Sequence, residues 1–128
     1  MTTERAGVNP EIHVELLWFA DCPNHEEARR LLHEVLDQRG IPVTVEDIDA
    51  TDPAVAEQLR FPGSPTIRVN GQDVAPGFVD PGDYAPRCRI YWTKAGPRGL
   101  PERAWIEAAL EAAAEVVRPS PGEALRRE

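Results

Sequence analysis

The stretch Trp18-Phe19-Ala20-Asp21-Cys22-Pro23-Asn24-His25 stands where a short apolar run gives way to a helix-forming segment. The run, residues 12–19, is apolar and bounded, which predicts a buried strand. The segment after it, residues 24–39, carries one apolar stripe and ends at Gly40, which predicts a helix. The stripe consists of Ala28, Leu31, Leu32, Val35 and Leu36. Cys22 is therefore expected at a strand-to-helix junction.

The next part of the chain continues this alternation of strands and helices. Residues 43–48 alternate apolar and polar side chains and predict a second strand. Asp52-Pro53 supplies an N-cap and a first-turn proline for a short helix. Residues 66–69 predict a third strand. Asn70-Gly71 predicts a tight turn, which leads to a short return strand at residues 72–75.

Proline and glycine are concentrated after this point. Residues 76–87 predict a loop, residues 88–93 have strand character, and residues 94–99 predict another turn. A last helix is expected to open at Leu100 or Pro101. Its apolar face consists of Trp105, Ile106, Ala109, Leu110, Ala113, Val116 and Val117. The element order is thus β-α-β-α-β-β, then a loop and an extra strand, then α.

This order predicts an α/β domain with a four-stranded mixed sheet and three flanking helices. Right-handed β-α-β connections would place the second strand parallel to the first, and the hairpin would add antiparallel strands on the other side. Residues 11–118 are expected to form this single domain. We expect residues 1–10 to be a disordered lead-in and residues 119–128 to be a flexible tail.

Composition limits the classes of partner. The net charge is −8, with 22 acidic against 14 basic residues, which argues against nucleic acid or an anionic membrane as a partner. No run approaches the roughly 20 apolar residues of a membrane span. The polar start of the chain does not resemble a signal peptide, so we expect a cytoplasmic protein. Two cysteines do not make a disulfide scaffold, so they are expected to be reactive, metal-binding or buried.

Three motifs in this order make residues 12–117 similar to the thioredoxin-like superfamily. They are Trp18-Phe19-Ala20-Asp21-Cys22-Pro23, Ser64-Pro65-Thr66 and Asn70-Gly71. The chain also resembles small bacterial thioredoxin-fold proteins that are often labelled alkylmercury lyase. The resemblance implies a nucleophilic Cys22 that faces a cis-Pro65, and X-Pro bonds do adopt the cis form. In one departure from the superfamily, His25 replaces the second cysteine of C-x-x-C, so a local disulfide cannot form.

Cys22 is the candidate nucleophile. Free backbone N–H groups and the helix dipole at a helix start favour a thiolate, which is both the nucleophile and the soft-metal ligand. If the helix begins at Pro23, Cys22 is the N-cap residue. If Asn24 is the N-cap, with Glu27 as its capping-box partner, Cys22 lies further out. The alternative interpretation is a small buried apolar residue.

Four other residues complete the candidate site. His25 could transfer a proton or bind a metal, or it could simply face solvent in the first turn. Cys88 follows a loop that can fold back toward Cys22, as a resolving thiol or a second soft-metal ligand; a buried strand cysteine is the alternative. The resemblance implies that Ser64 offers backbone groups to an extended substrate and that Pro65 keeps metals off the thiol.

Three functions follow from these residues. The first is a thiol redox protein, a thiol-disulfide oxidoreductase that acts through Cys22 on disulfides or other electrophilic sulfur, is resolved by Cys88 and needs no cofactor. Its partners would be protein or small-molecule thiols and disulfides. The second is soft-metal or organomercury handling by Cys22 and Cys88, as in an alkylmercury lyase. The third is a non-catalytic binding module that uses the loop at residues 76–87, because function does not follow from fold.

Overall fold

A computed structural model of the protein describes residues 12–117. The predicted lead-in at residues 1–10 and the predicted tail at residues 119–128 lie outside the described residues. The elements are, in chain order, β1 (Ile12–Trp18), α2 (His25–Arg39), β2 (Val43–Asp49), α3 (Pro53–Gln58), β3 (Thr66–Val69), β4 (Gln72–Asp73), β5 (Tyr91–Thr93), β6 (Gly96–Arg98) and α4 (Arg103–Val117).

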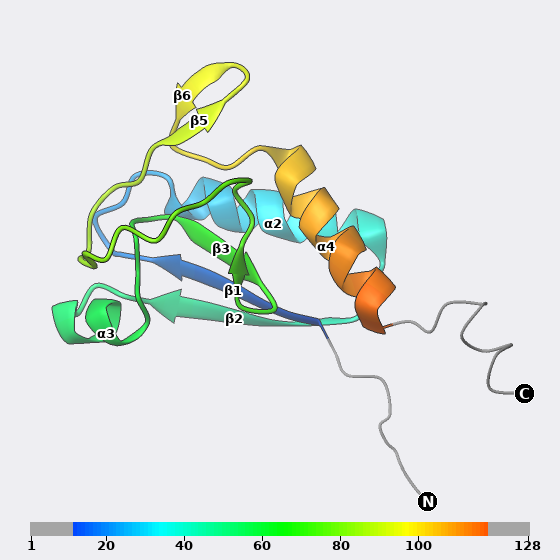
Figure 1. Ribbon diagram of the computed structural model, residues 1–128, viewed down its shortest axis with the longest axis horizontal. Helices are drawn as coiled ribbons and strands as arrows, with labels where there is room; N and C mark the ends of the chain where they lie inside the picture. Colours follow the sequence, from blue (N-terminus) through cyan, green and yellow to red (C-terminus); the bar gives the residue numbers. More distant parts are fainter. Residues whose placement is uncertain (1–11, 118–128) are drawn as a thin grey trace, which may run out of the picture.

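The described chain forms a four-stranded mixed sheet in the order β2-β1-β3-β4 (Figure 1). β1 pairs with β2 in parallel and with β3 antiparallel, and β4 returns antiparallel to β3. This arrangement confirms the predicted mixed sheet and its three helices. Strand β1 is therefore an interior strand of the sheet, and it leads into the Cys22 loop.

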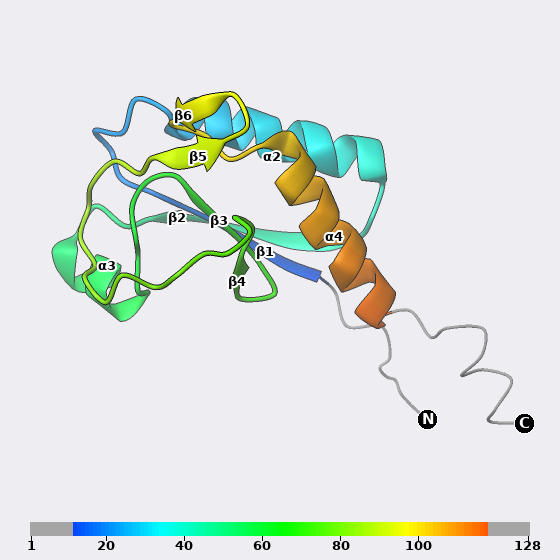
Figure 2. The same ribbon diagram turned by 45° about the horizontal axis from the view of Figure 1, so that its top comes forward.

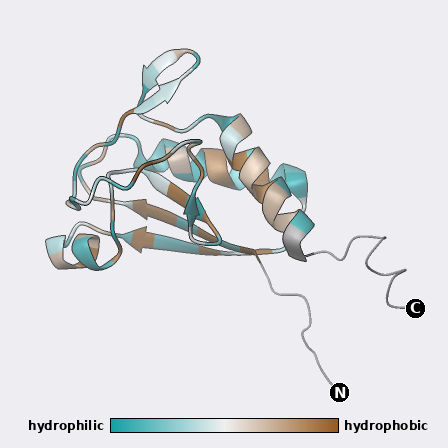
Figure 3. Ribbon diagram, in the orientation of Figure 1, coloured by the Kyte–Doolittle hydropathy of each residue, from teal (hydrophilic) through white to brown (hydrophobic). Residues whose placement is uncertain are grey.

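Helices α2 and α4 cover one face of the sheet (Figures 1 and 2). The alternation along β1 decides which side chains meet them, because neighbouring strand residues point to opposite faces. Val14 and Leu16 pack with Leu32 of α2 and Leu110 of α4 in the main core. In Figure 3 the hydrophobic colours follow these strands and helices. This core fixes where α2 begins relative to β1.

The opposite face of the sheet is only partly covered. Leu17 packs there in a second, smaller core beneath α3, together with Ala50, Ala56 and Phe61. The remaining part of this face carries polar side chains, beginning with His13, which is exposed. The end of β1 is therefore buried on this face by α3 and the residues that flank it.

The predicted local signals at helix and turn boundaries are largely confirmed. Asp52 caps α3 by accepting a hydrogen bond of 2.9 Å from the Ala54 amide. Gly40 closes α2 with φ 64°, and the Asn70-Gly71 turn has φ 50° and 84°. Asn24, not Cys22, is the N-cap of α2, and its side chain makes no capping hydrogen bond.

The largest difference from the expected elements lies between residues 88 and 99. Only Tyr91–Thr93 of the predicted strand at residues 88–93 forms β5, and residues 96–98 of the predicted turn pair with it as β6. The backbone next to Cys88 pairs instead with Ser64. The local strand pattern could not show this change of partner, because the pairing joins segments far apart in the sequence. Helix α4 also begins later than predicted, at Arg103.

Candidate site at the start of helix α2

Cys22 lies in the loop that joins β1 to α2, two residues before the N-cap. Its amide donates to the Phe19 carbonyl over 3.0 Å, which closes a tight turn. Its sulfur accepts a hydrogen bond from the Asn24 amide, with a distance of 3.4 Å from nitrogen to sulfur. The residue is 4% exposed. The predicted boundary with Asn24 as the N-cap is therefore correct. The Asn24 amide at the start of the helix still donates a hydrogen bond to the Cys22 sulfur.

His25 is the first residue of α2, and its ring is turned toward β1. The imidazole stacks on the indole of Trp18, with 4.7 Å between ring centroids and 17° between ring planes. Its Nδ1 atom is buried and has no hydrogen-bond partner. Within residues 12–117, no hydrogen bond joins this ring to the sulfur of Cys22. A buried polar atom without a partner is unusual in folded proteins, and a role of His25 in proton transfer stays a prediction.

Charged groups hold the Trp18 ring in place beneath His25. The indole N–H donates to Asp47 over 2.5 Å, and Arg29 bonds the same carboxylate at 2.6 Å while it lies 5.4 Å from the indole centroid. The hydrogen bond from Arg29 lowers the pKa of Asp47. At the end of β2, hydrogen bonds from Thr51 lower the pKa of Asp49, and the nearby His25 contributes electrostatically. Two ionised carboxylates, those of Asp47 and Asp49, therefore lie near the stacked pair.

The Ser64-Pro65 peptide bond is cis, as the resemblance implied. Ser64 is fully buried, and its hydroxyl lies 3.4 Å from the amide nitrogen of Phe19, in the Cys22 loop. Its own amide donates to the Arg87 carbonyl over 2.7 Å, and its carbonyl accepts from the Arg89 amide over 3.0 Å. The backbone groups that the resemblance assigned to a substrate are thus occupied by the chain itself. A substrate role for Ser64 and Pro65 stays a prediction.

Cys88 is exposed and lies opposite Ser64 in a parallel bridge. Ser64 touches both cysteine-bearing segments, because its hydroxyl meets the Cys22 loop and its backbone meets residues 87–89. Figures 1 and 2 show these segments at the same end of the molecule. Both cysteines are free thiols. The fold therefore brings the Cys88 segment to the site, and direct reaction between the two sulfurs stays a prediction.

Sequence reasoning missed the residues that fasten the Cys88 segment. Arg89 forms an ion pair of 2.7 Å with Asp73, and the hydroxyl of Tyr91 donates to the Pro65 carbonyl. The sequence signal was the alternation of residues 88–92, in which Arg89 and Tyr91 share one face. This pattern could predict a common orientation but could not identify Asp73 as the partner.

One further cluster has the chemistry of a metal site. The ligand atoms of His13, Glu15 and Glu46 all lie within 4.8 Å of one another on the open face of the sheet. His13 and Glu46 form a hydrogen bond of 2.9 Å, and Glu15 lies 3.8 Å from a guanidinium nitrogen of Arg68. The hydrogen bond and the ion pair within the protein are sufficient to explain why these three side chains lie together. The sequence alone could not indicate this cluster, because Glu46 comes next to His13 only through the pairing of β1 with β2.

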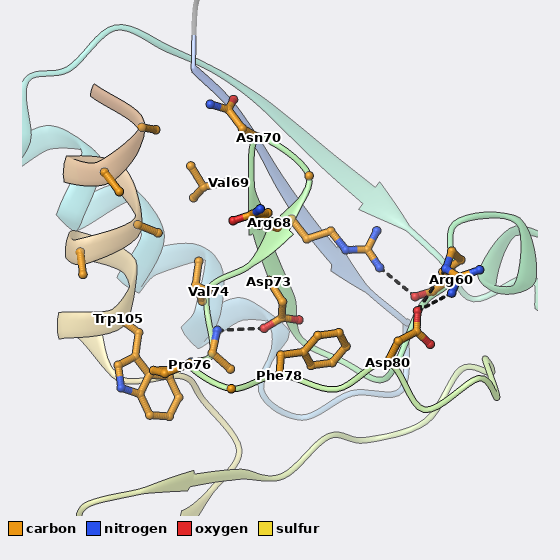
Figure 4. A pocket seen from close by; sticks show the side chains of 18 of the residues that line it. Arg60, Arg68, Val69, Asn70, Asp73, Val74, Pro76, Phe78, Asp80 and Trp105 are labelled. Carbon is orange, nitrogen blue, oxygen red and sulfur yellow. Dashed lines mark hydrogen bonds and ion pairs between the residues drawn. The ribbon is translucent and has the colours of Figure 1, made fainter. Parts of the chain in front are cut away.

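An open groove of about 1000 Å³ runs along β4 and the adjacent face of α4 (Figure 4). Trp105 lines one side, and Phe78 and Asp80 of the loop at residues 76–87 line the other. In this loop, hydrogen bonds from the Tyr84 hydroxyl and the Gly82 amide, together with Arg60, lower the pKa of Asp80 to about 2. None of the predicted site residues lines the groove. The groove is therefore separate from the cysteine site.

Comparison of the chain with models of known protein families finds no match, and no curated protein or solved structure matches it either. Among residues 12–117, no helix combines the length and the apolar character that a membrane span requires.

Proposed function

We propose that the protein is a thioredoxin-like thiol redox protein in which Cys22 attacks disulfides or other electrophilic sulfur. The observation that carries this proposal is the Asn24 amide aimed at the Cys22 sulfur at the entrance to α2. An N–H donor and the positive end of a helix both stabilise negative charge on sulfur. The mixed sheet, the order of its elements and the cis-Pro65 in the neighbouring loop support the thioredoxin-like assignment.

The reaction is a thiol-disulfide exchange. The Cys22 thiolate attacks one sulfur of a substrate disulfide, a mixed disulfide forms, and the other substrate sulfur leaves as a thiolate that takes up a proton. A second thiol then attacks the Cys22 sulfur and releases the first half of the substrate. The substrate gains two electrons, and the two participating thiols become a disulfide.

Two residues assist in this scheme. His25 lies in the first turn of α2 with a free Nδ1, and it exchanges protons with the thiols that react and leave. Cys88 supplies the second thiol, since its segment lies next to Ser64 and its side chain is exposed. Two equivalents of an external small thiol then reduce the resulting disulfide, restore both cysteines and leave as the small-molecule disulfide.

The direct test measures the reaction of each thiol with 2,2′-dithiodipyridine, a small aromatic disulfide. We expect Cys22→Ser to abolish the fast phase of thiopyridone release and Cys88→Ser to retain it. A Cys22→Ser variant that keeps the full fast phase would refute the proposal. The matched substitution at Cys88 controls for the loss of one thiol.

The groove along β4 and α4 favours a second candidate, a binding module. It is lined partly by the loop at residues 76–87, which the sequence suggested as a partner surface. This candidate becomes the better account if Cys22 reacts no faster than the thiol of an unstructured peptide.

A further inference from the structure

We infer that residues 87–89 form a fixed segment that occupies the backbone groups of Ser64, so that Cys22 acts on small-molecule disulfides in preference to extended polypeptides. We call residues 87–89 the strap. This inference rests on the proposed function, because it names the substrate class of the same site. It concerns which substrates can reach Cys22, and the Cys22 chemistry itself is unchanged.

The first evidence is the hydrogen bonding of Ser64. An extended peptide that adds to a strand uses the free N–H and C=O groups of that strand. Here the Ser64 amide is bonded to the Arg87 carbonyl at 2.7 Å and the Ser64 carbonyl to the Arg89 amide at 3.0 Å. Ser64 is also fully buried. An incoming peptide backbone therefore finds both groups taken.

The second evidence is the anchoring of the strap by Arg89. Its guanidinium bonds both carboxylate oxygens of Asp73, at 2.7 and 3.1 Å, and donates to the Thr66 hydroxyl at 2.9 Å. The side chains of Arg89 and Asp73 are 10% and 2% exposed. Breaking a buried pair of this kind leaves an uncompensated charge, which is strongly unfavourable. The strap is thus tied to β3 and to the end of β4.

The third evidence comes from the residues around the Arg89–Asp73 ion pair, which we call the anchor. The guanidinium of Arg89 lies over the rings of both Phe78 and Tyr91, 5.0 and 4.3 Å from their centroids. A side chain at Gly63 would place its Cβ 2.9 Å from the Cβ of Arg89, so only glycine allows this close approach. Tyr91 is buried and bonds the Pro65 carbonyl. Contacts on several sides therefore hold the strap in place.

The consequence is a distinction between two kinds of disulfide. A small disulfide needs access only to the Cys22 sulfur, whereas an extended peptide also needs a strand edge to align its backbone. Since the strap occupies this edge, the intact protein should discriminate against the peptide. Loosening the strap should reduce the discrimination.

The test compares two probes with the same leaving group. It uses the Cys88→Ser variant, so that the measured release of thiopyridone comes from the reaction of Cys22 alone. The probes are 2,2′-dithiodipyridine and an unstructured ten-residue peptide whose central cysteine carries a thiopyridyl group. Each rate is divided by the rate of the same probe with a free cysteine peptide. We expect the normalised rate of the small probe to exceed that of the peptide probe by at least tenfold.

The variant Asp73→Asn removes one partner of the anchor. We expect it to raise the normalised peptide rate at least fivefold and to change the small-probe rate less than twofold. Arg87→Ala is the matched control, because it alters an arginine of the strap but keeps the backbone bonds and the anchor, and it should leave both rates unchanged. If Asp73→Asn does not fold, Tyr91→Phe replaces it as a milder loss of one strap contact, with the same direction expected.

Equal normalised rates for the two probes in the Cys88→Ser protein would overturn the inference. Discrimination that neither anchor variant reduces would also overturn it, because the strap would not be its cause. Failure of Cys22 to react with either probe would instead refute the proposed function, and the inference would fall with it. Reaction of Cys22 with both probes at equal rates leaves the proposed function intact, so the two failures are distinguishable.

Discussion

Cys22 and Cys88 differ in what surrounds their sulfur atoms. Cys22 is buried and accepts a backbone N–H, whereas Cys88 is exposed on the strap. The sequence could predict that Cys22 lies near a helix start, because the strand and helix patterns on either side are local. It could not predict the exposure of Cys88, because the long-range pairing with Ser64 determines it.

A prediction at the residue scale concerns His25. Replacing it with phenylalanine keeps a ring to stack on Trp18 but removes Nδ1. We expect the reaction of Cys22 with 2,2′-dithiodipyridine to slow by about a hundredfold, as is typical for loss of a general acid-base group. The pH dependence of the rate, measured by stopped flow, should also lose one ionisation step.

The same substitution at His33, an exposed residue of α2, serves as the control and should change neither the rate nor its pH dependence. An unchanged pH profile in His25→Phe would show that His25 has only a structural role.

A second prediction at this scale concerns Tyr91, whose pKa is raised well above its usual value by burial. In the folded protein the phenol stays protonated, while in the unfolded chain it ionises near pH 10. Its contribution to stability is therefore full below about pH 10 and is lost as the pH rises further. In urea unfolding at several pH values, wild type should lose stability above pH 10 faster than Tyr91→Phe. Parallel pH curves for the two proteins would contradict this account.

At the scale of elements, local sequence signals determine some helices and strands, and pairing with other segments determines the rest. Residues 66–69 form a strand as predicted, because alternation and the Asn70-Gly71 turn are adjacent in sequence. Residues 96–98 form β6 although a turn was expected, because their pairing with β5 outweighs a weak local pattern. Helices with capping residues and the β3–β4 hairpin could be predicted, whereas the β5–β6 hairpin, whose strands are adjacent in the sequence, was missed because Gly96 and Pro97 favour a turn. Residues 87–89, whose pairing depends on the distant Ser64, could not be predicted from a local pattern.

The N-cap of α3 gives a prediction at this scale. Asp52→Ala removes the acceptor for the Ala54 amide and should lower the free energy of unfolding by about 1 kcal/mol. Asp37→Ala, on the exposed side of α2, is the control and should change stability by less than about 0.5 kcal/mol. Equal effects of the two variants in urea unfolding would show that the cap does not stabilise α3.

At the scale of the whole molecule, two cores on opposite faces of the sheet position the site. The main core fixes α2 against β1, and the smaller core around Phe61 supports the end of β1 and the loop that leads to Ser64. The sequence predicted the sheet order correctly because handedness leaves few choices. It could not predict that the strap occupies the backbone groups of Ser64, since that depends on the partnership of Asp73 and Arg89.

Phe61 tests the importance of the smaller core. The side chain is fully buried, so Phe61→Ala should lower the free energy of unfolding by about 3–5 kcal/mol. Val79→Ala, at a residue that is 80% exposed, is the control and should have little effect. A loss below about 1 kcal/mol in Phe61→Ala would mean that the second core contributes little to stability.

The most direct test of the central claim is the relative rate at which the two cysteines of the intact protein react with 2,2′-dithiodipyridine. Brief reaction, alkylation of the remaining thiols and peptide mapping by mass spectrometry give a rate for each. Exposure alone predicts that Cys88 reacts first, because Cys22 is buried. An activated Cys22 should instead react faster than Cys88 and faster than the thiol of an unstructured peptide. A Cys22 rate at or below that of the peptide thiol would contradict the account.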